Sequence, residues 1–225
     1  MKKQELKNDP IRDYIVNAYN YFDENKNITY SVSLAVIFSL FMFVYLNNNK
    51  TKFNLNSSFK SGITQNLFLL SEQSGNIENK NISIEEFNSI VGGDYNKESI
   101  NQAVIYLIKN AKDNNEDIIT IIDKNYFNSD DEFLNSYYNG IVGDYYSKSN
   151  NFKSAINYYE KCINSFDNHD DTLIDFNLSY IFSLIKNDEV NNAKSQFELI
   201  DYEKLSFGSK NKYDIFKNNY SSILK

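Results

Sequence analysis

An uncharged apolar segment near the N-terminus constrains the fold of this chain more than any other feature. Residues 27–49 contain no charged side chain, and residues 28–46, ITYSVSLAVIFSLFMFVYL, are almost entirely apolar. As an α-helix this stretch would be about 28 Å long, close to the thickness of about 30 Å of the hydrocarbon core of a bilayer. Tyr30 and Tyr45 lie near its two ends, where aromatic rings favour the membrane interface. We therefore predict one transmembrane helix over residues 28–46.

Two other structures are compatible with an apolar run of this length. A buried helix of a soluble protein is rarely apolar on every face. A cleaved signal peptide has a short basic leader and a small-residue cleavage site, whereas this leader is long and half acidic, and the run ends in three Asn residues. We therefore favour an uncleaved anchor.

The distribution of basic residues predicts the orientation of the anchor, because Lys and Arg near a membrane helix favour the cytoplasmic side. Five basic residues precede the helix, and only three follow it closely (Lys2, Lys3, Lys7, Arg12 and Lys26 against Lys50, Lys52 and Lys60). The bias predicts a single crossing with the N-terminus in the cytoplasm. In a bacterium, this orientation places the anchor in the inner membrane and the C-terminal part in the periplasm.

Residues 1–27 are predicted to form a cytoplasmic segment with an amphipathic helix. Asp9 can cap this helix, and Pro10 suits its first turn. Apolar residues then recur at helical spacing along one stripe: Ile11, Tyr14, Ile15, Ala18, Tyr19 and Phe22. The stripe fits a helix lying in the membrane interface or a docking face for another membrane protein, and we favour the first.

The rest of the chain is predicted to be all-α. Residues 47–60 are rich in Asn, Lys and Ser and are interpreted as a polar linker. Residues 61–225 contain few helix breakers, because the whole chain has one Pro and 7 Gly. Apolar stripes predict helices near residues 63–70, 82–90, 100–111 and 115–127, and an amphipathic terminal helix from Tyr213 to Leu224.

Residues 133–166 resemble one tetratricopeptide repeat (TPR), a hairpin of two antiparallel helices of about 34 residues. The resemblance rests on small and large residues in the order that such a hairpin packs them, and a second unit follows in which Ala193 lies 38 residues after Ala155. Ile181 stands where this second unit should have a small residue. The residues assigned to repeat packing are Gly143, Tyr146, Phe152, Ala155, Tyr159, Cys162, Ala193 and Phe197.

An N-terminal anchor followed by an acidic TPR-like solenoid resembles a bacterial inner-membrane family that includes the ancillary subunit of the Sec translocon. In TPR proteins the first helix of each repeat lines a concave binding face. Carried onto this chain, the resemblance implies a partner-binding groove at Tyr137, Gly140, Asp144 and Ser147. These positions lack the basic and Asn residues of the clamps that bind C-terminal carboxylates of chaperones, so that ligand is not implied.

Charge and motifs exclude several classes of function. The formal net charge is −7, all of it beyond residue 27, and an acidic domain repels nucleic-acid phosphates. The one histidine, His169, is predicted to stand in a polar loop. Cys162 is predicted at a packing position in a helix, with no second histidine to partner it, which favours a buried inert thiol. The Gly92-Gly93 turn lacks the spacing and the basic residue of a phosphate loop. We therefore expect no enzyme, metal, cofactor or small-molecule substrate.

The sequence favours a membrane-anchored protein-interaction module that assists protein translocation or periplasmic chaperones. Its expected partners are translocon subunits, periplasmic chaperones or secreted chains. The alternative function is a structural scaffold in a cell-envelope complex for division or outer-membrane assembly.

Overall fold

The structure is a computed structural model that describes residues 10–112, 115–164 and 171–224. Within these residues it consists of helices and turns without a β-strand, which confirms the prediction of an all-α chain for this part. The α-helices are α1 (Pro10–Glu24), α2 (Lys26–Ser74), α3 (Ile77–Gly92), α4 (Lys97–Lys109), α5 (Glu116–Asp123), α6 (Glu132–Lys148), α7 (Phe152–Asn164), α8 (Ile174–Lys186), α9 (Val190–Glu198), α10 (Phe207–Asn219) and α11 (Ser221–Leu224). Two short 3-10 helices, η2 (Asp171–Leu173) and η3 (Tyr202–Lys204), precede α8 and α10.

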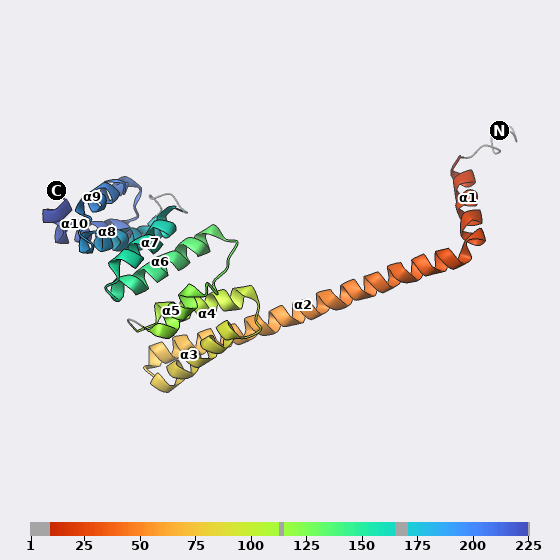
Figure 1. Cartoon of the computed structure of the whole chain (residues 1–225), viewed down its shortest axis with the longest axis horizontal. Helices are drawn as coiled ribbons and strands as arrows, with labels where there is room; N and C mark the ends of the chain where they lie inside the picture. The colour runs from red at the N-terminus through yellow and green to blue at the C-terminus, as the bar shows by residue number, and fades with distance from the viewer. Residues whose placement is uncertain (1–9, 113–114, 165–170, 225) are drawn as a thin grey trace. The chain divides into compact units, whose positions relative to one another are not determined.

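The contacts of the chain divide it into two units, Met1–Phe53 and Asn54–Lys225. The first contains α1 and the beginning of α2; the second, which we call the helical domain, contains residues 54–74 of α2 and all later helices (Figure 1). Of the helices in the described ranges, α2 alone is long and apolar enough to cross a membrane, from Tyr30 onward, and its most apolar part is not buried.

The segment predicted as a polar linker is helical. Residues 47–60 lie inside α2, and the helical domain begins at Asn54 rather than at residue 61. Between residue 27 and Gly62 there is no Gly or Pro to end the helix, and hydroxyl side chains in residues 47–60 make local or tertiary hydrogen bonds. Thr51 Oγ1, for example, donates to the carbonyl of Asn47 at 2.9 Å.

Small hydroxyl residues form the face that α2 buries in the helical domain. Ser57, Ser61, Thr64 and Ser71 are buried beside Phe68 at alternating spacings of three and four residues. Small side chains let neighbouring helices approach closely, and the hydroxyls find acceptors: Ser61 Oγ donates to Gln102 Oε1 of α4 at 2.6 Å. The helix predicted near residues 63–70 therefore exists, but Ile63, Leu69 and Leu70 on it are exposed.

The abundant Asn, Asp and Ser residues help to set the helix boundaries. A side-chain oxygen at an N-cap accepts a hydrogen bond from a backbone N–H of the first turn, which has no partner within the helix. Such caps begin α3, α4, α5, α6 and α10, and the capping residues are Asn76, Asn96, Asn115, Asp131 and Ser206.

Two helical hairpins, α6–α7 and α8–α9, share one geometry at an offset of 38 residues. Each turns through a residue in the left-handed region, Asn150 (φ 58°) and Asp188 (φ 62°). In each, the next backbone N–H bonds to a carbonyl five residues earlier, Asn151 to Tyr146 and Glu189 to Leu184, both at 2.9 Å. The same offset separates Ala155 from Ala193, both fully buried, as the sequence predicts.

The hairpins pack side by side within the helical domain. Helix α7 contacts both α6 and α8, while α4, α6, α8 and α10 contact one another in sequence. Stacked aromatic rings join successive elements: Phe127 lies on Tyr138 with ring centroids 4.1 Å apart, and Phe197 on Tyr213 at 4.6 Å. The buried apolar side chains of the described chain all lie in this domain, from Phe68 to Tyr213.

Candidate partner-binding groove

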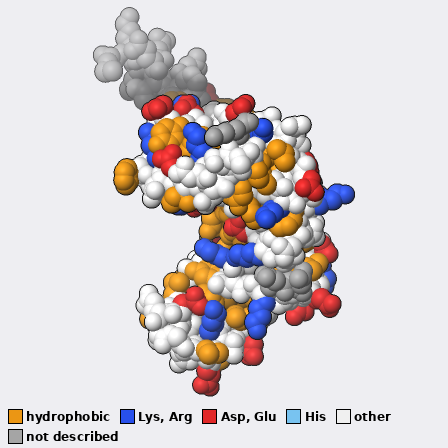
Figure 2. All heavy atoms as spheres, turned by 90° about the vertical axis from the view of Figure 1, so that its left-hand side faces the viewer, with side chains coloured by type: hydrophobic (Ala, Val, Ile, Leu, Met, Phe, Trp, Pro, Cys, Tyr) orange, Lys and Arg blue, Asp and Glu red, His pale blue; other side chains and the backbone are white. Residues whose placement is uncertain are grey.

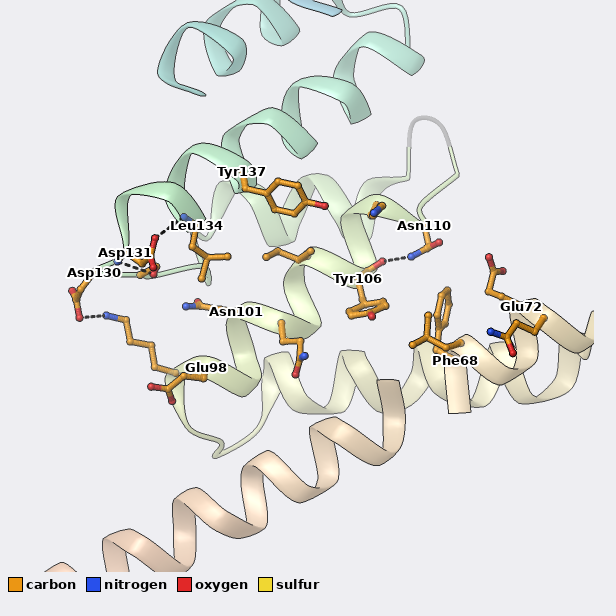
Figure 3. Close-up of a pocket in the computed structure, with 17 residues that line it drawn as sticks. Phe68, Glu72, Glu98, Asn101, Tyr106, Asn110, Asp130, Asp131, Leu134 and Tyr137 are labelled. Atoms are coloured by element: carbon orange, nitrogen blue, oxygen red, sulfur yellow. Dashed lines mark hydrogen bonds and ion pairs between the residues drawn. The ribbon is translucent and has the colours of Figure 1, made fainter. Parts of the chain in front are cut away.

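A hollow of about 950 Å³ lies between α2, α4 and α6 in the helical domain. Its floor is apolar and comes from all three helices. Figure 3 shows Phe68 of α2, Tyr106 of α4, and Leu134 and Tyr137 of α6 directed toward this space. Ile105 of α4 and Leu69 of α2 complete the apolar surface. We call this feature the α2–α4–α6 groove.

An aromatic cluster fixes one end of the floor. Tyr106 stacks on Phe87 of α3 at 5.0 Å and meets Phe68 edge-on at 5.5 Å. Lys80 pairs with Glu72, and its ammonium lies 5.5 Å from the centre of the Phe68 ring. Offset and edge-on aromatic pairs add stability beyond their buried area, so these contacts stabilise this end of the floor.

A hydrogen-bonded row of side chains fixes the wall between α2 and α4. Gln102 Nε2 donates to Gln65 Oε1 at 2.7 Å, and Gln65 Nε2 donates to the Tyr106 hydroxyl at 2.8 Å. With the bond from Ser61 to Gln102, this row ties the two helices together over about one turn of each. Each amide therefore has partners for its oxygen and its nitrogen, as half-buried polar groups require.

A second connection fixes the α6 side of the groove. The Asn101 side chain donates to the carbonyl of Asn128 at 2.8 Å and accepts from its backbone N–H at 2.9 Å. Lys97 pairs with Asp130 at 3.0 Å, and Asp131 caps α6 through the N–H of Leu134 (Figure 3). The loop before α6 is thus fastened to α4.

The rim of the groove is predominantly acidic. Four carboxylates and two ammonium groups line it: Glu72, Glu98, Asp130, Asp131, Lys97 and Lys109. The helical domain from residue 54 onward carries 16 Lys and 25 Asp or Glu, a formal net charge of −9. Both the rim and its surroundings therefore attract cationic partners.

The groove continues along the inner helices. A hollow of about 260 Å³ between α4, α6 and α8 shares Tyr137 and Lys109 with it, and one of about 460 Å³ between α8 and α10 shares Asp175 with that hollow. On the face seen in Figure 2, hydrophobic and lysine side chains gather around a hollow in the domain. An extended chain segment is the kind of ligand that such a row of hollows can accommodate.

The four groove residues predicted from α6 fall in different environments. Tyr137 lines the α2–α4–α6 groove, and Asp144 lines the smaller hollow beside α8. Ser147 is half-buried and accepts from Ser183 of α8 at 3.4 Å. Gly140 is covered by the ring of Phe176, which lies within 2.6 Å of where a Cβ would be, so Gly140 packs α6 against α8 and has no surface for a partner.

Asp144 is a partly buried carboxyl group that lines the smaller hollow beside α8. It accepts a hydrogen bond of 2.6 Å from the hydroxyl of Tyr159. Burial raises the pKa of Asp144, and the bond from Tyr159 only partly opposes that effect. Burial raises the pKa of Tyr159 as well, so burial opposes the charged form of both groups.

The residues assigned to repeat packing lie mostly in the core. Ala155, Tyr159, Cys162 and Ala193 are fully buried, and Gly143 and Phe197 are buried beside them. The half-buried Tyr146 stacks on Tyr158 at 5.6 Å, and the ring of Phe152 meets Phe182 of α8 at 6.0 Å. These contacts join α6 to α7 and α7 to α8.

Most of the groove cannot be predicted from α6 alone. The prediction omits the α2 and α4 residues that line it, although the sequence contains a signal for two of them. Ile105 and Tyr106 are apolar residues that lie off the buried stripe of Ala103, Val104, Leu107 and Ile108. Apolar side chains beside a complete core stripe indicate a second contact surface.

The described residues contain no group of three or more His, Cys, Asp and Glu side chains that could hold a metal ion. Cys162 is buried without a disulfide partner, and burial raises its pKa to about 12, so its thiol stays protonated. His169 lies outside the described residues. A scan against models of known protein families and a search of curated proteins find no match to this chain.

Proposed function

We propose that this chain is a membrane-anchored protein-interaction module. In this proposal α2 crosses a bacterial inner membrane once, and the helical domain stands on the periplasmic side as a TPR-like solenoid. The length and apolar surface of α2 support the anchor. The two hairpins with one turn geometry, 38 residues apart, support the repeat, because stacked similar hairpins characterise solenoids.

The observation that carries the proposal is the α2–α4–α6 groove, with its apolar floor and acidic rim. Grooves between helices accept extended or helical segments through a few apolar anchors. The rim carboxylates and the charge of −9 on the domain favour basic side chains next to those anchors. The proposed ligand is therefore a segment of a secreted chain, chaperone or translocon subunit that combines large apolar residues with Lys or Arg.

Peptide binding tests the ligand chemistry. Full-length protein in lipid nanodiscs is titrated with two fluorescent peptides that share Leu and Phe anchors and differ only in having Lys or Glu between them. We expect the Lys peptide to bind at least about tenfold more tightly at low salt and less so at high salt. Equal affinity for the two peptides would contradict the electrostatic part of the proposal.

Neighbouring residues on α2 provide a matched pair of variants. Leu69 lines the groove, whereas Leu70 does not, and both side chains are about half exposed. Leu69→Lys should abolish binding of the Lys peptide, and Leu70→Lys should leave it unchanged. Glu98→Lys in the rim and Glu85→Lys outside it make the same comparison for charge. If both members of each pair behave alike, the ligand binds elsewhere.

A second surface favours the alternative function, a scaffold in a cell-envelope complex. On α2, Leu55, Phe59, Ile63 and Leu70 are more than half exposed and lie on one side of the helix. Such a stripe suits the apolar face of a helix in a permanent partner. Photo-crosslinkers at positions 69 and 70 distinguish the two functions in cells. The interaction module is supported if position 69 crosslinks to secreted chains, chaperones or translocon subunits. The scaffold is supported if position 70 crosslinks to division or outer-membrane assembly proteins.

A further inference from the structure

Helix α1 has an apolar side that remains exposed. Tyr14 is 81% exposed, Tyr19 is 68% exposed, and Ile15 and Phe22 are more than half exposed. These residues recur at three- and four-residue spacing and form one side of the helix, with Ala18 between them. Outside this side, α1 carries two further exposed large apolar residues, Val16 and Tyr21. In water this side of α1 would be an unfavourable surface.

The turn between α1 and α2 directs the apolar side of α1 toward the beginning of α2. Helix α1 and the beginning of α2 belong to the first unit, and α1 turns sharply away from the axis of α2 (Figure 1). Asn25 ends α1 through its backbone N–H and its side chain, which both bond to the carbonyl of Tyr21. Tyr19 and Phe22 line a hollow of about 190 Å³ together with Lys26 and Tyr30 of α2.

This geometry has a consequence if α2 crosses a membrane. The apolar part of α2 begins at Tyr30, and an aromatic residue at the end of a span lies at the headgroup level. Tyr19 and Phe22 approach α2 at that level, and the other residues of their stripe continue along α1 away from α2. A helix that turns sharply off the span there lies along the membrane surface with its apolar side toward the acyl chains.

We propose that α1 is an interfacial membrane helix whose apolar side inserts into the lipid surface next to the span. This inference rests on the anchoring part of the proposed function and is independent of the groove. The occupant of the apolar side is lipid, because the hollow and the turn place that side at the entrance of the span. A docked protein is the other possible occupant and is an outcome of the test.

The charges of α1 predict how it binds. Interfacial helices attracted by anionic lipids carry Lys and Arg on the polar side. Here the charged residues from α1 to the start of α2 are Arg12 and Lys26 against Asp13, Asp23 and Glu24, and Lys26 already pairs with Asp23 at 2.8 Å. Insertion should therefore depend on the apolar side alone and be insensitive to anionic lipid and to salt.

Single tryptophans provide a direct test, because the natural chain contains none. Full-length protein is reconstituted into phosphatidylcholine vesicles with brominated acyl chains, which quench tryptophan fluorescence at short range. Three variants are compared: Tyr14→Trp on the apolar side of α1, Asn20→Trp on its polar side, and Phe38→Trp within the proposed span. We expect quenching at position 14 to be at least about twofold stronger than at position 20, and quenching at position 38 to be strong.

The three positions separate the possible failures. Strong quenching at position 38 with equal quenching at positions 14 and 20 would show an anchored chain whose α1 lies off the lipid, and it would leave a docked protein as the occupant. Weak quenching at position 38 would overturn the anchor and the present inference together. Quenching at position 14 that appears only after phosphatidylglycerol is added would contradict the apolar mode of insertion.

Discussion

The substitution Gly143→Ala tests how closely α6 and α7 pack. A Cβ at position 143 would lie 2.6 Å from Cδ1 and Cε1 of Tyr159 and 3.0 Å from its Cγ. Carbon atoms in favourable contact are about 3.5–4.0 Å apart, so the added methyl group is about 1 Å too close. The Tyr159 ring cannot easily move away, because it is fully buried and its hydroxyl donates to Asp144.

Two effects of opposite sign decide the outcome. Alanine in the middle of a helix is favoured over glycine by about 0.5–1 kcal/mol. Forcing an extra methyl group into a packed core costs about 1–3 kcal/mol, and weakening the bond from Tyr159 to Asp144 adds about 1 kcal/mol. We therefore expect Gly143→Ala to destabilise the helical domain by about 2 kcal/mol, which lowers Tm by about 4–8 °C for a domain of this size.

The assay is thermal unfolding of a fragment of residues 54–225, monitored by circular dichroism. This fragment contains the whole described core. Gly62→Ala is the matched control, because Gly62 lies in the middle of α2 and a Cβ added there would have nothing within 4 Å of it. That substitution should raise Tm by a few degrees through helix propensity alone. If Gly143→Ala also raises Tm, the close approach of α6 and α7 is refuted.

Two further predictions concern buried titratable groups. Burial raises the pKa of Asp144 above its unfolded value, so the contribution of this group to stability is present at low pH and is lost as pH rises through the folded pKa. The substitution Asp144→Asn removes the charge and keeps an oxygen that can accept from Tyr159. It should therefore raise Tm at about pH 7 and do so much less at about pH 4. Asp144→Leu, which leaves the Tyr159 hydroxyl without that acceptor, should lower Tm at both pH values, and similar effects of the Asn and Leu variants would contradict this assignment. Burial raises the pKa of Cys162 to about 12, so its thiol should react with a thiol reagent only when the domain unfolds. Fast labelling of the folded domain at neutral pH would show that Cys162 is not buried as described.

Local rules are sufficient to predict several of the helices, including α4, and the pairing of α6 with α7. The stripe from Ile100 to Ala111 corresponds to α4, and the order of Gly143, Ala155 and Tyr159 corresponds to a crossing in which the glycine faces the tyrosine ring. Such patterns are readable because contacts within a hairpin join residues that are close in sequence. The same reasoning predicts the second hairpin at an offset of 38 residues, with Ile181 buried where a smaller residue is expected.

The part of α2 formed by residues 47–60, and the side of α2 that is buried beyond it, are not predictable by the same rules. An apolar stripe is the usual signal of a buried helix face, but here the buried face consists of Ser57, Ser61, Thr64 and Ser71. A composition of Asn, Ser and Lys is also typical of flexible linkers. The sequence therefore predicts a linker where the structure has a helix, because the hydroxyls are satisfied by contacts that the sequence does not show, such as Ser61 to Gln102.

The groove depends on this same face of α2, which explains why α6 alone predicts an incomplete site. Gln65, Gln102 and Tyr106 form one hydrogen-bonded row only because α2 and α4 approach closely over small residues. In this row, Gln65 and Gln102 are separated by 37 positions and Gln65 and Tyr106 by 41, and none of the three carries a motif. Residues of α2 line one side of the groove, so if α2 crosses a membrane, as we propose, the same helix serves both the anchor and the proposed binding site.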